Sequence, residues 1–185
     1  MNTCPTLKPS GFSLIEVLIA VVVMMTLLAA AIPSYRTFLL NSQIRNAAES
    51  IQNGLQRARS EAVTRNVNVQ FNLLPVATND QSSWTVSVPS LAPADPVIDT
   101  RRSSDGSKNV IRTVFPAGAS TLTFDITGRP TANADGSATI TMISLDLDPA
   151  VLSAAESQDL NVTIDFGGKI RMCDPHAPTG SPRVC

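Results

Sequence analysis

Residues 11 to 20 read GFSLIEVLIA and place one carboxylate near the start of a long apolar segment. Glu16 is the only charged residue between Phe12 and Ile32. An α-helix rises about 1.5 Å per residue, and about 20 apolar residues are enough to cross a bilayer. The segment is longer than the apolar core of a signal peptide, which is typically about 7–15 residues. We therefore predict a membrane-spanning helix, with cleavage by a signal peptidase after the alanines at 29–31 as the alternative.

The carboxylate of Glu16 needs an explanation in this setting. A charged side chain costs about 2.5–3.5 kcal/mol at the centre of a membrane helix, and less near its end. A neighbouring cation would offset this cost, whereas a carboxylate that reaches the aqueous boundary would need no partner. The residues around Glu16 leave both interpretations open.

After Pro33 the apolar residues follow the period of an amphipathic helix. They recur every three or four residues and form one stripe, at Leu40, Ile44, Ala47, Ile51, Leu55, Ala58 and Ala62. We therefore predict one continuous helix from about Phe12 to about Thr64. Its first part would lie in lipid, and its second part would pack on a domain.

From Asn66 onward apolar residues alternate with polar ones, as they do in half-buried β-strands. The predicted strands are 67–73, 84–88, 110–115, 121–126, 138–147 and 160–166. Residues 89–108 contain several proline, aspartate and serine residues and are predicted to form a long surface loop. The predicted fold class is α+β: a long N-terminal helix packed on an antiparallel β-sheet or small sandwich head.

The stretch NVTIDFGGKIRMC, residues 161–173, predicts a hairpin with a defined register. A two-residue loop would mix apolar and charged residues on one face. A three-residue loop, Phe166-Gly167-Gly168, pairs Ile164 with Ile170 and leaves Lys169 and Arg171 together on the solvent face. Because a shift of one residue exchanges the two faces, the apolar match favours the three-residue loop, with its last glycine in the left-handed conformation.

Composition limits the chemistry that this chain can perform. The net charge is -1, so no overall basic field attracts nucleic acid. His176 is the only histidine and lies in a proline-rich stretch, so we predict no metal, no cofactor and no enzymatic activity. The cysteines are Cys4, Cys173 and Cys185. If Cys4 is lost with a leader, the other two are predicted to form a disulfide worth roughly 3 kcal/mol in an oxidising compartment.

The segment Gly11-Phe12-Ser13-Leu14-Ile15-Glu16 resembles the class III signal of type IV pilins and type II secretion pseudopilins. The resemblance implies that a prepilin peptidase cuts between Gly11 and Phe12 and that the new Phe12 amine is methylated. It also implies that Glu16 meets the Phe12 amine of a neighbouring subunit during assembly, and that the helix kinks at Pro33. The implied divisions are a leader at 1–11, a transmembrane and filament-core helix at 12–33, an amphipathic helix at 34–65 and a β-rich periplasmic head at 66–185.

Two further stretches, LQRARSEAVTRN at 55–66 and TFDITGRP at 123–130, resemble the GspH/FimT group of minor pilins and pseudopilins. This resemblance covers most of the chain. It implies a head of two β-sheets packed on the helix, in the initiation or tip complex of a type IV pilus or a type II secretion pseudopilus. The implied partners are prepilin peptidase, other minor and major pilins or pseudopilins, and the inner membrane, which the chain would cross once with its C-terminal head in the periplasm.

A second hypothesis, from a different functional class, is binding of double-stranded DNA during natural transformation. FimT-like minor pilins carry a DNA-binding G-R-x-R motif in this hairpin, and the present chain reads Gly168-Lys169-Ile170-Arg171. Lysine keeps the charge for phosphate contact but lacks the bidentate fork of arginine. The candidate contacts are Lys169, Arg171 and Arg183, and the simpler alternative is that these cations belong to an ordinary solvated face.

Overall fold

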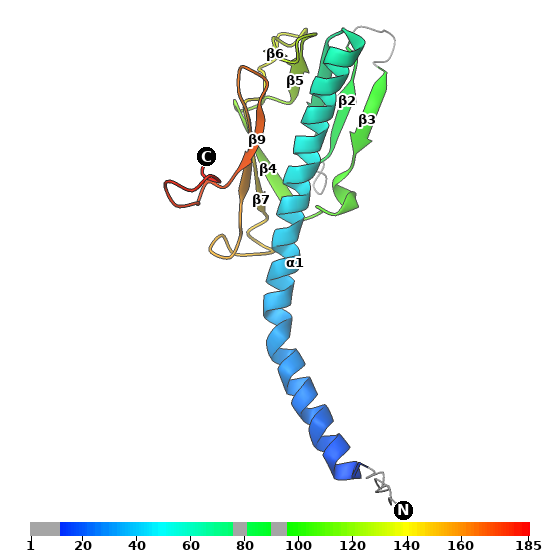
Figure 1. Ribbon diagram of the computed structural model, residues 1–185, viewed down its shortest axis with the longest axis vertical. Coiled ribbons are helices and arrows are strands. Elements are labelled where there is room, and N and C mark those ends of the chain that lie inside the picture. Colours follow the sequence, from blue (N-terminus) through cyan, green and yellow to red (C-terminus); the bar gives the residue numbers. More distant parts are fainter. Residues whose placement is uncertain (1–11, 76–80, 90–95) are drawn as a thin grey trace, which may run out of the picture. The chain divides into compact units, whose positions relative to one another are not determined.

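The chain forms two compact units, Met1–Arg36 and Thr37–Cys185. A computed structural model describes residues 12–75, 81–89 and 96–185. Helix α1, Leu14–Arg65, contributes residues to both units (Figure 1). Its ends lie within two residues of the predicted ones, so the prediction of one continuous helix is confirmed.

The second unit contains two β-sheets, and all pairs of neighbouring strands in them are antiparallel. The first sheet has the order β3-β2-β1-β5-β6, with β1 at Val69–Leu73, β2 at Trp84–Ser87, β3 at Val97–Arg101, β5 at Thr121–Phe124 and β6 at Pro130–Thr131. The second has the order β4-β7-β8-β9, with β4 at Val110–Phe115, β7 at Met142–Leu147, β8 at Leu160–Ile164 and β9 at Ile170–Cys173. A 3-10 turn, Ser103–Asp105, lies between β3 and β4. The predicted α+β class is confirmed.

The head half of α1 supplies one wall of the hydrophobic core. All seven residues of the predicted apolar stripe are buried and cluster with residues from both sheets. Gly54 lies on the same face of the helix. Two aromatic rings come so close to it that they leave no room for a side chain. A Cβ added at Gly54 would lie 2.9 Å from the rings of Phe71 and Trp84. The Trp84 indole also donates a hydrogen bond to the Ser50 hydroxyl at 3.0 Å, so the aromatic pair is fixed against the helix from two directions.

The prediction of a loop over residues 89–108 is wrong for its second half. Strand β3 and the 3-10 turn occupy this segment, whereas 90–95 lie outside the described residues. Four of the five β3 residues are exposed, so an edge strand of this kind has no buried alternation for a sequence pattern to reveal. The predicted strand at 138–147 also begins later, at Met142, because residues 139–141 bond first to one sheet and then to the other. The two-residue strand β6 was not predicted.

Candidate functional site

The first candidate site is the membrane-length segment that precedes the head. Every side chain from Phe12 to Arg36 is exposed, although one 18-residue window of the helix has a mean hydropathy of 2.7. An apolar surface of this extent marks contact with lipid or with another protein. The helix is long and apolar enough to cross a membrane.

Glu16 lies in the first turn of α1, where the partial positive charge of the helix N-terminus favours a carboxylate. The helix begins at Leu14, and the Val17 N–H donates to the Ser13 carbonyl at 3.2 Å. Ser13 and Glu16 therefore have the S-x-x-E spacing of a capping box. This spacing was readable in the sequence but was not used in the prediction. Among the described residues, Glu16 has no ion pair, so its carboxylate remains available for a cation from outside the chain.

Three other residues of this segment were predicted to have a role, and their positions are as follows. Gly11 lies outside the described residues. Phe12 is 82% exposed and borders the same shallow depression as Glu16, four residues further along. Pro33 lies inside the helix, which continues through it. Proline has no N–H to donate, so the helix loses one backbone hydrogen bond there.

The second candidate site is the hairpin formed by β8 and β9. Its register is the predicted one, because Ile164 pairs with Ile170 and Thr163 pairs with Arg171. The Asp165 N–H donates to the Lys169 carbonyl at 3.1 Å, which closes the predicted three-residue loop. Gly168 has a φ of 76°, in the left-handed region that glycine tolerates.

The three cations proposed for DNA lie on the β8–β9 hairpin and on the C-terminal tail that returns beside it. Lys169 and Arg171 are exposed on one face of β9, and the Arg171 Nη2 donates to the Val184 carbonyl at 2.8 Å. Lys169 borders a hollow beside the last turns of α1. Arg183 borders a second hollow that Lys169 does not line. Lys169 and Arg171 therefore lie two residues apart on one side of the β8–β9 hairpin, and Arg171 is bonded to the residue that follows Arg183.

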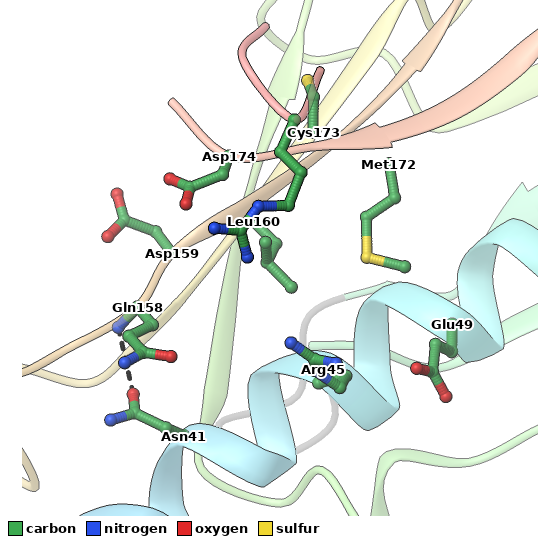
Figure 2. Close-up of a pocket in the computed structure, with 10 residues that line it drawn as sticks. Asn41, Arg45, Glu49, Gln158, Asp159, Leu160, Met172, Cys173 and Asp174 are labelled. Atoms are coloured by element: carbon green, nitrogen blue, oxygen red, sulfur yellow. Dashed lines mark hydrogen bonds between the residues drawn. The ribbon is translucent and has the colours of Figure 1, made fainter. Parts of the chain in front are cut away.

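The hollow in Figure 2 has a volume of about 250 Å³ and mixed charge. Its lining residues come from α1, from β8 and β9 and from the segments next to them: Asn41, Arg45, Glu49, Gln158, Asp159, Leu160, Met172, Cys173, Asp174 and Arg183. Asn41 fixes the lower wall, since its Oδ1 accepts from the Gln158 N–H at 3.0 Å and its Nδ2 donates to the Glu156 carbonyl at 2.9 Å. Within the described part of the chain, no group of three or more histidine, cysteine or acidic residues is placed to hold a metal ion.

The C-terminal tail is attached to β9 by a disulfide. Cys173 and Cys185 are joined, as the cysteine count predicts, and Cys173 is buried. The Asp174 N–H donates to the Arg183 carbonyl at 2.7 Å, so the returning tail also bonds to the backbone just beyond β9. His176, in the loop between the two cysteines, is 75% exposed and lies 3.5 Å from an oxygen of Asp159.

Two five-residue loops with the same hydrogen-bond pattern lie next to each other beside the helix. They are Asp125–Arg129, DITGR, and Asp165–Lys169, DFGGK. In each loop the aspartate Oδ1 accepts two backbone N–H bonds, one from the second and one from the fourth following residue. The N–H bond from Arg129 is the main cause that lowers the pKa of Asp125, and the Thr127 side-chain bond adds to it. This repeated pattern was not predicted from the sequence.

These two loops are packed against each other and against Arg59. The Arg59 Nε donates to the Gly128 carbonyl at 3.0 Å. A Cβ added at Gly168 would lie only 2.2 Å from the same carbonyl oxygen. The β5–β6 turn, the β8–β9 turn and the helix are therefore joined at one point, which sets the position of β9 beside α1.

The fold and the exposed N-terminal segment define a class: proteins in which one membrane-length helix continues into the core of a two-sheet head. A model of the family described as type II transport protein GspH matches residues 47–168. The prokaryotic N-terminal methylation motif matches residues 7–32. The chain belongs to the GspH family, and with its methylation motif it is a protein of the minor pilin and pseudopilin type.

Solved structures of two proteins are similar to this chain. One is the type IV minor pilin FimU of Pseudomonas aeruginosa, with 19% identity, a TM-score of 0.51, and coverage of 80% of this chain and 98% of that one. The other is the minor pseudopilin EpsH from the type 2 secretion system of Vibrio cholerae, with 13% identity, a TM-score of 0.50, and coverage of 73% and 99%. At these identities the likeness shows the fold. A comparison with curated proteins gives no match.

Proposed function

We propose that this protein is processed between Gly11 and Phe12 and then assembles, through residues 12–33, into a type IV pilus or a type II secretion pseudopilus. The observation that carries the proposal is the fully exposed apolar surface of this segment, with Glu16 as its only charge. Residues 1–11 act as the leader, 34–65 as the amphipathic helix of the head and 66–185 as the periplasmic β-rich part. Before assembly the segment anchors the chain in the inner membrane.

Glu16 supplies the selectivity of this assembly. Cleavage frees an amine on Phe12, and a carboxylate in lipid gains from meeting a cation. Pairing with the Phe12 amine of a neighbouring subunit would offset the cost of both buried charges. It would also fix the axial position of one helix against the next. The place we propose for this subunit is the initiation or tip complex, next to other minor pilins or pseudopilins.

The test replaces Glu16 in the full chain, produced together with its prepilin peptidase and partner subunits. Glu16→Ala should leave membrane insertion unchanged, because it removes a desolvated charge, but it should strongly reduce recovery of the protein in sheared filaments. Glu156→Ala, which removes a carboxylate from the exposed surface of the head, is the control and should assemble normally. Normal incorporation of the Glu16 variant would show that the carboxylate has no pairing role.

A second candidate function is contact with double-stranded DNA through Lys169 and Arg171, two exposed residues that alternate with Ile170 along the β8–β9 hairpin. Two phosphate contacts would give a plot of log affinity against log salt a slope of roughly -2, since each contact contributes about -0.9. The double change Lys169→Ala and Arg171→Ala should abolish binding, Lys169→Arg should maintain or strengthen it, and Lys108→Ala is the control. Absence of binding at low salt would remove this function.

A further inference from the structure

The outer strands of the two sheets differ in how their free edges are protected. On β4, the Arg112 N–H donates to the Gln81 side-chain oxygen at 3.1 Å. On β3, the Thr100 N–H donates to the Asp99 carboxylate at 2.8 Å. On β6, Pro130 has no N–H to offer. Side-chain caps and prolines are ordinary means of preventing an edge strand from pairing with another chain.

Strand β9 lacks such protection in its first part. Hydrogen-bonded and non-hydrogen-bonded pairs alternate along an antiparallel ladder. Since Lys169 is in a hydrogen-bonded pair with Asp165, Arg171 is in the next one. The backbone N–H and C=O groups of Ile170 and Met172 therefore point away from β8. Within the described residues, no hydrogen bond to these groups is found.

The C-terminal tail marks the end of this open edge. The Asp174 N–H points outward by the same alternation, and it is the group that donates to the Arg183 carbonyl. Asp174 and Val184 form a short parallel bridge there. The tail thus already pairs with the outer side of the chain just beyond β9, and the positions at Ile170 and Met172 stay open.

Two hollows lie beside the open positions. The first borders Ile170, has a volume of about 550 Å³ and is otherwise lined by α1 and Lys169: Gln56, Arg59, Ser60, Val63, Thr64 and Lys169. The second is the hollow of Figure 2, which borders Met172. Residues two apart on a strand face the same side. A strand added to β9 could therefore place alternate side chains into the two hollows, as peptides do when they extend a sheet.

The charged side chains on the other face of this strand determine which kind of partner strand it favours. Lys169 and Arg171 alternate with Ile170 and Met172, so an added strand would have every second side chain next to a cation. Pairing of two β9 strands from two copies of this chain would instead bring like charges together, which is unfavourable. The edge therefore favours an acidic partner over a second copy.

We propose that the open edge of β9 accepts an extended segment of a neighbouring pilin or pseudopilin subunit, in which acidic and apolar residues alternate. The acidic residues face Lys169 and Arg171, and the apolar residues between them pack against the side chains of Ile170 and Met172. The identity of the partner as a filament subunit rests on the function proposed above, whereas the capacity of β9 to add an acidic strand does not.

The test uses the full chain in non-ionic detergent micelles and a capped nine-residue peptide of alternating valine and glutamate. Hydrogen exchange is measured at single amides. Without peptide, the amides of Ile170 and Met172 should exchange at least tenfold faster than that of Arg171, which donates to β8. Saturating peptide should slow Ile170 and Met172 at least tenfold, and a valine–lysine peptide should not. Unchanged exchange with the acidic peptide would overturn the proposal.

Two sets of variants test separately the contribution of the backbone N–H groups and that of the charged side chains. Ile170→Pro and Met172→Pro remove outward N–H groups without removing a bond to β8, so each should abolish peptide binding, whereas Ile170→Val and Met172→Leu should retain it. Should a proline variant not fold, the double change Lys169→Glu and Arg171→Glu decides. It should reverse the preference, so that the lysine peptide binds and the glutamate peptide does not. A preference that does not reverse would contradict the assignment of Lys169 and Arg171.

The same assay keeps this inference distinct from the assembly proposal. The Glu16→Ala chain should bind the acidic peptide with unchanged affinity while its recovery in filaments falls. A wild-type chain that assembles but never binds the peptide would refute strand addition and leave the role of Glu16 intact. A Glu16→Ala chain that binds the peptide and still assembles normally would refute the role of Glu16 and leave strand addition intact.

Discussion

The contact between the two aspartate loops should make Gly168 one of the least replaceable residues of the head. Gly168→Ala puts a side chain on a residue with a φ of 76°, which costs about 1–2 kcal/mol for an L-residue. The new Cβ would also lie 2.2 Å from the Gly128 carbonyl oxygen, so the two turns must separate. Forced repacking of this kind costs about 1–3 kcal/mol.

These contributions can be combined. The lower entropy of the unfolded chain with alanine returns about 0.4–1 kcal/mol. Movement of Gly128 would also weaken its bond from Arg59, and a hydrogen bond from a charged group contributes about 1.5–3 kcal/mol. Because repacking and the loss of this bond describe one displacement, we do not add both in full. We expect a net loss of about 2–4 kcal/mol in the free energy of unfolding.

Gly136→Ala provides a matched control. Gly136 has a φ of 73°, and an added Cβ there meets no atom within 4 Å. It should therefore show only the conformational cost, reduced by the same entropy effect, or about 0.5–1 kcal/mol in total. The difference between the two variants isolates the contact between the loops.

The assay is urea unfolding of the full chain in micelles, followed by the fluorescence of Trp84. This residue is the only tryptophan, and it is buried against Gly54 in the core. Both variants should unfold with the slope of the wild type, and their midpoints should differ. If Gly168→Ala were within about 0.5 kcal/mol of Gly136→Ala, the two loops would not be packed as described, and the position of β9 beside α1 would need another explanation.

Three other outcomes are expected. Mass spectrometry of the membrane-extracted protein should find N-methylated Phe12 at its N-terminus, and a chain that begins at Met1 or Ile32 would exclude the proposed cleavage. Reduction of the Cys173–Cys185 disulfide should lower the free energy of unfolding by roughly 3 kcal/mol, since it releases a constraint on the unfolded chain; two free thiols in the exported protein would show that the bond does not form. The folded-state pKa of Asp125 is lowered, so its contribution to stability is present above its unfolded pKa of about 3.8 and is lost as the pH falls through the folded value. Asp125→Asn should flatten the loss of stability below about pH 4, and an unchanged acid profile would show that this carboxylate is not responsible.

Local patterns predicted the parts of this fold that bury one face. The helix stripe from Leu40 to Ala62 was readable because each third or fourth residue is apolar, and all of them are in the core. The register of the last hairpin was readable for a similar reason. Only one loop length places Ile164 opposite Ile170 and keeps Lys169 on the polar face, and the structure has that length.

Strand β3 was missed because local pattern carries little information at an exposed edge. Val97 is 62% exposed, and only Ile98 in this strand is partly buried. The strand is formed by backbone pairing with β2, which is itself held by the burial of Trp84 and Val86. Its existence thus depends on a neighbour and not on its own composition.

The repeated loops show a different kind of limit. The pattern of an aspartate, two variable residues, a glycine and a basic residue occurs at both Asp125 and Asp165, and its local hydrogen bonds follow from that spacing. The distance of 2.2 Å from a Gly168 Cβ to the Gly128 carbonyl does not follow from it, because the loops belong to different sheets.

The open edge of β9 depends on the order of the strands in the same way. The alternation of Lys169 and Arg171 with Ile170 and Met172 predicts two faces for the strand, but it cannot tell whether another strand lies beside it. Had the tail residues that precede its parallel bridge at Asp174 run extended along β9, the same strand would be an interior one and the cations would only be a solvated face. The tail forms a turn at Ser181–Val184 instead, and this turn leaves the cationic strand able to accept a partner.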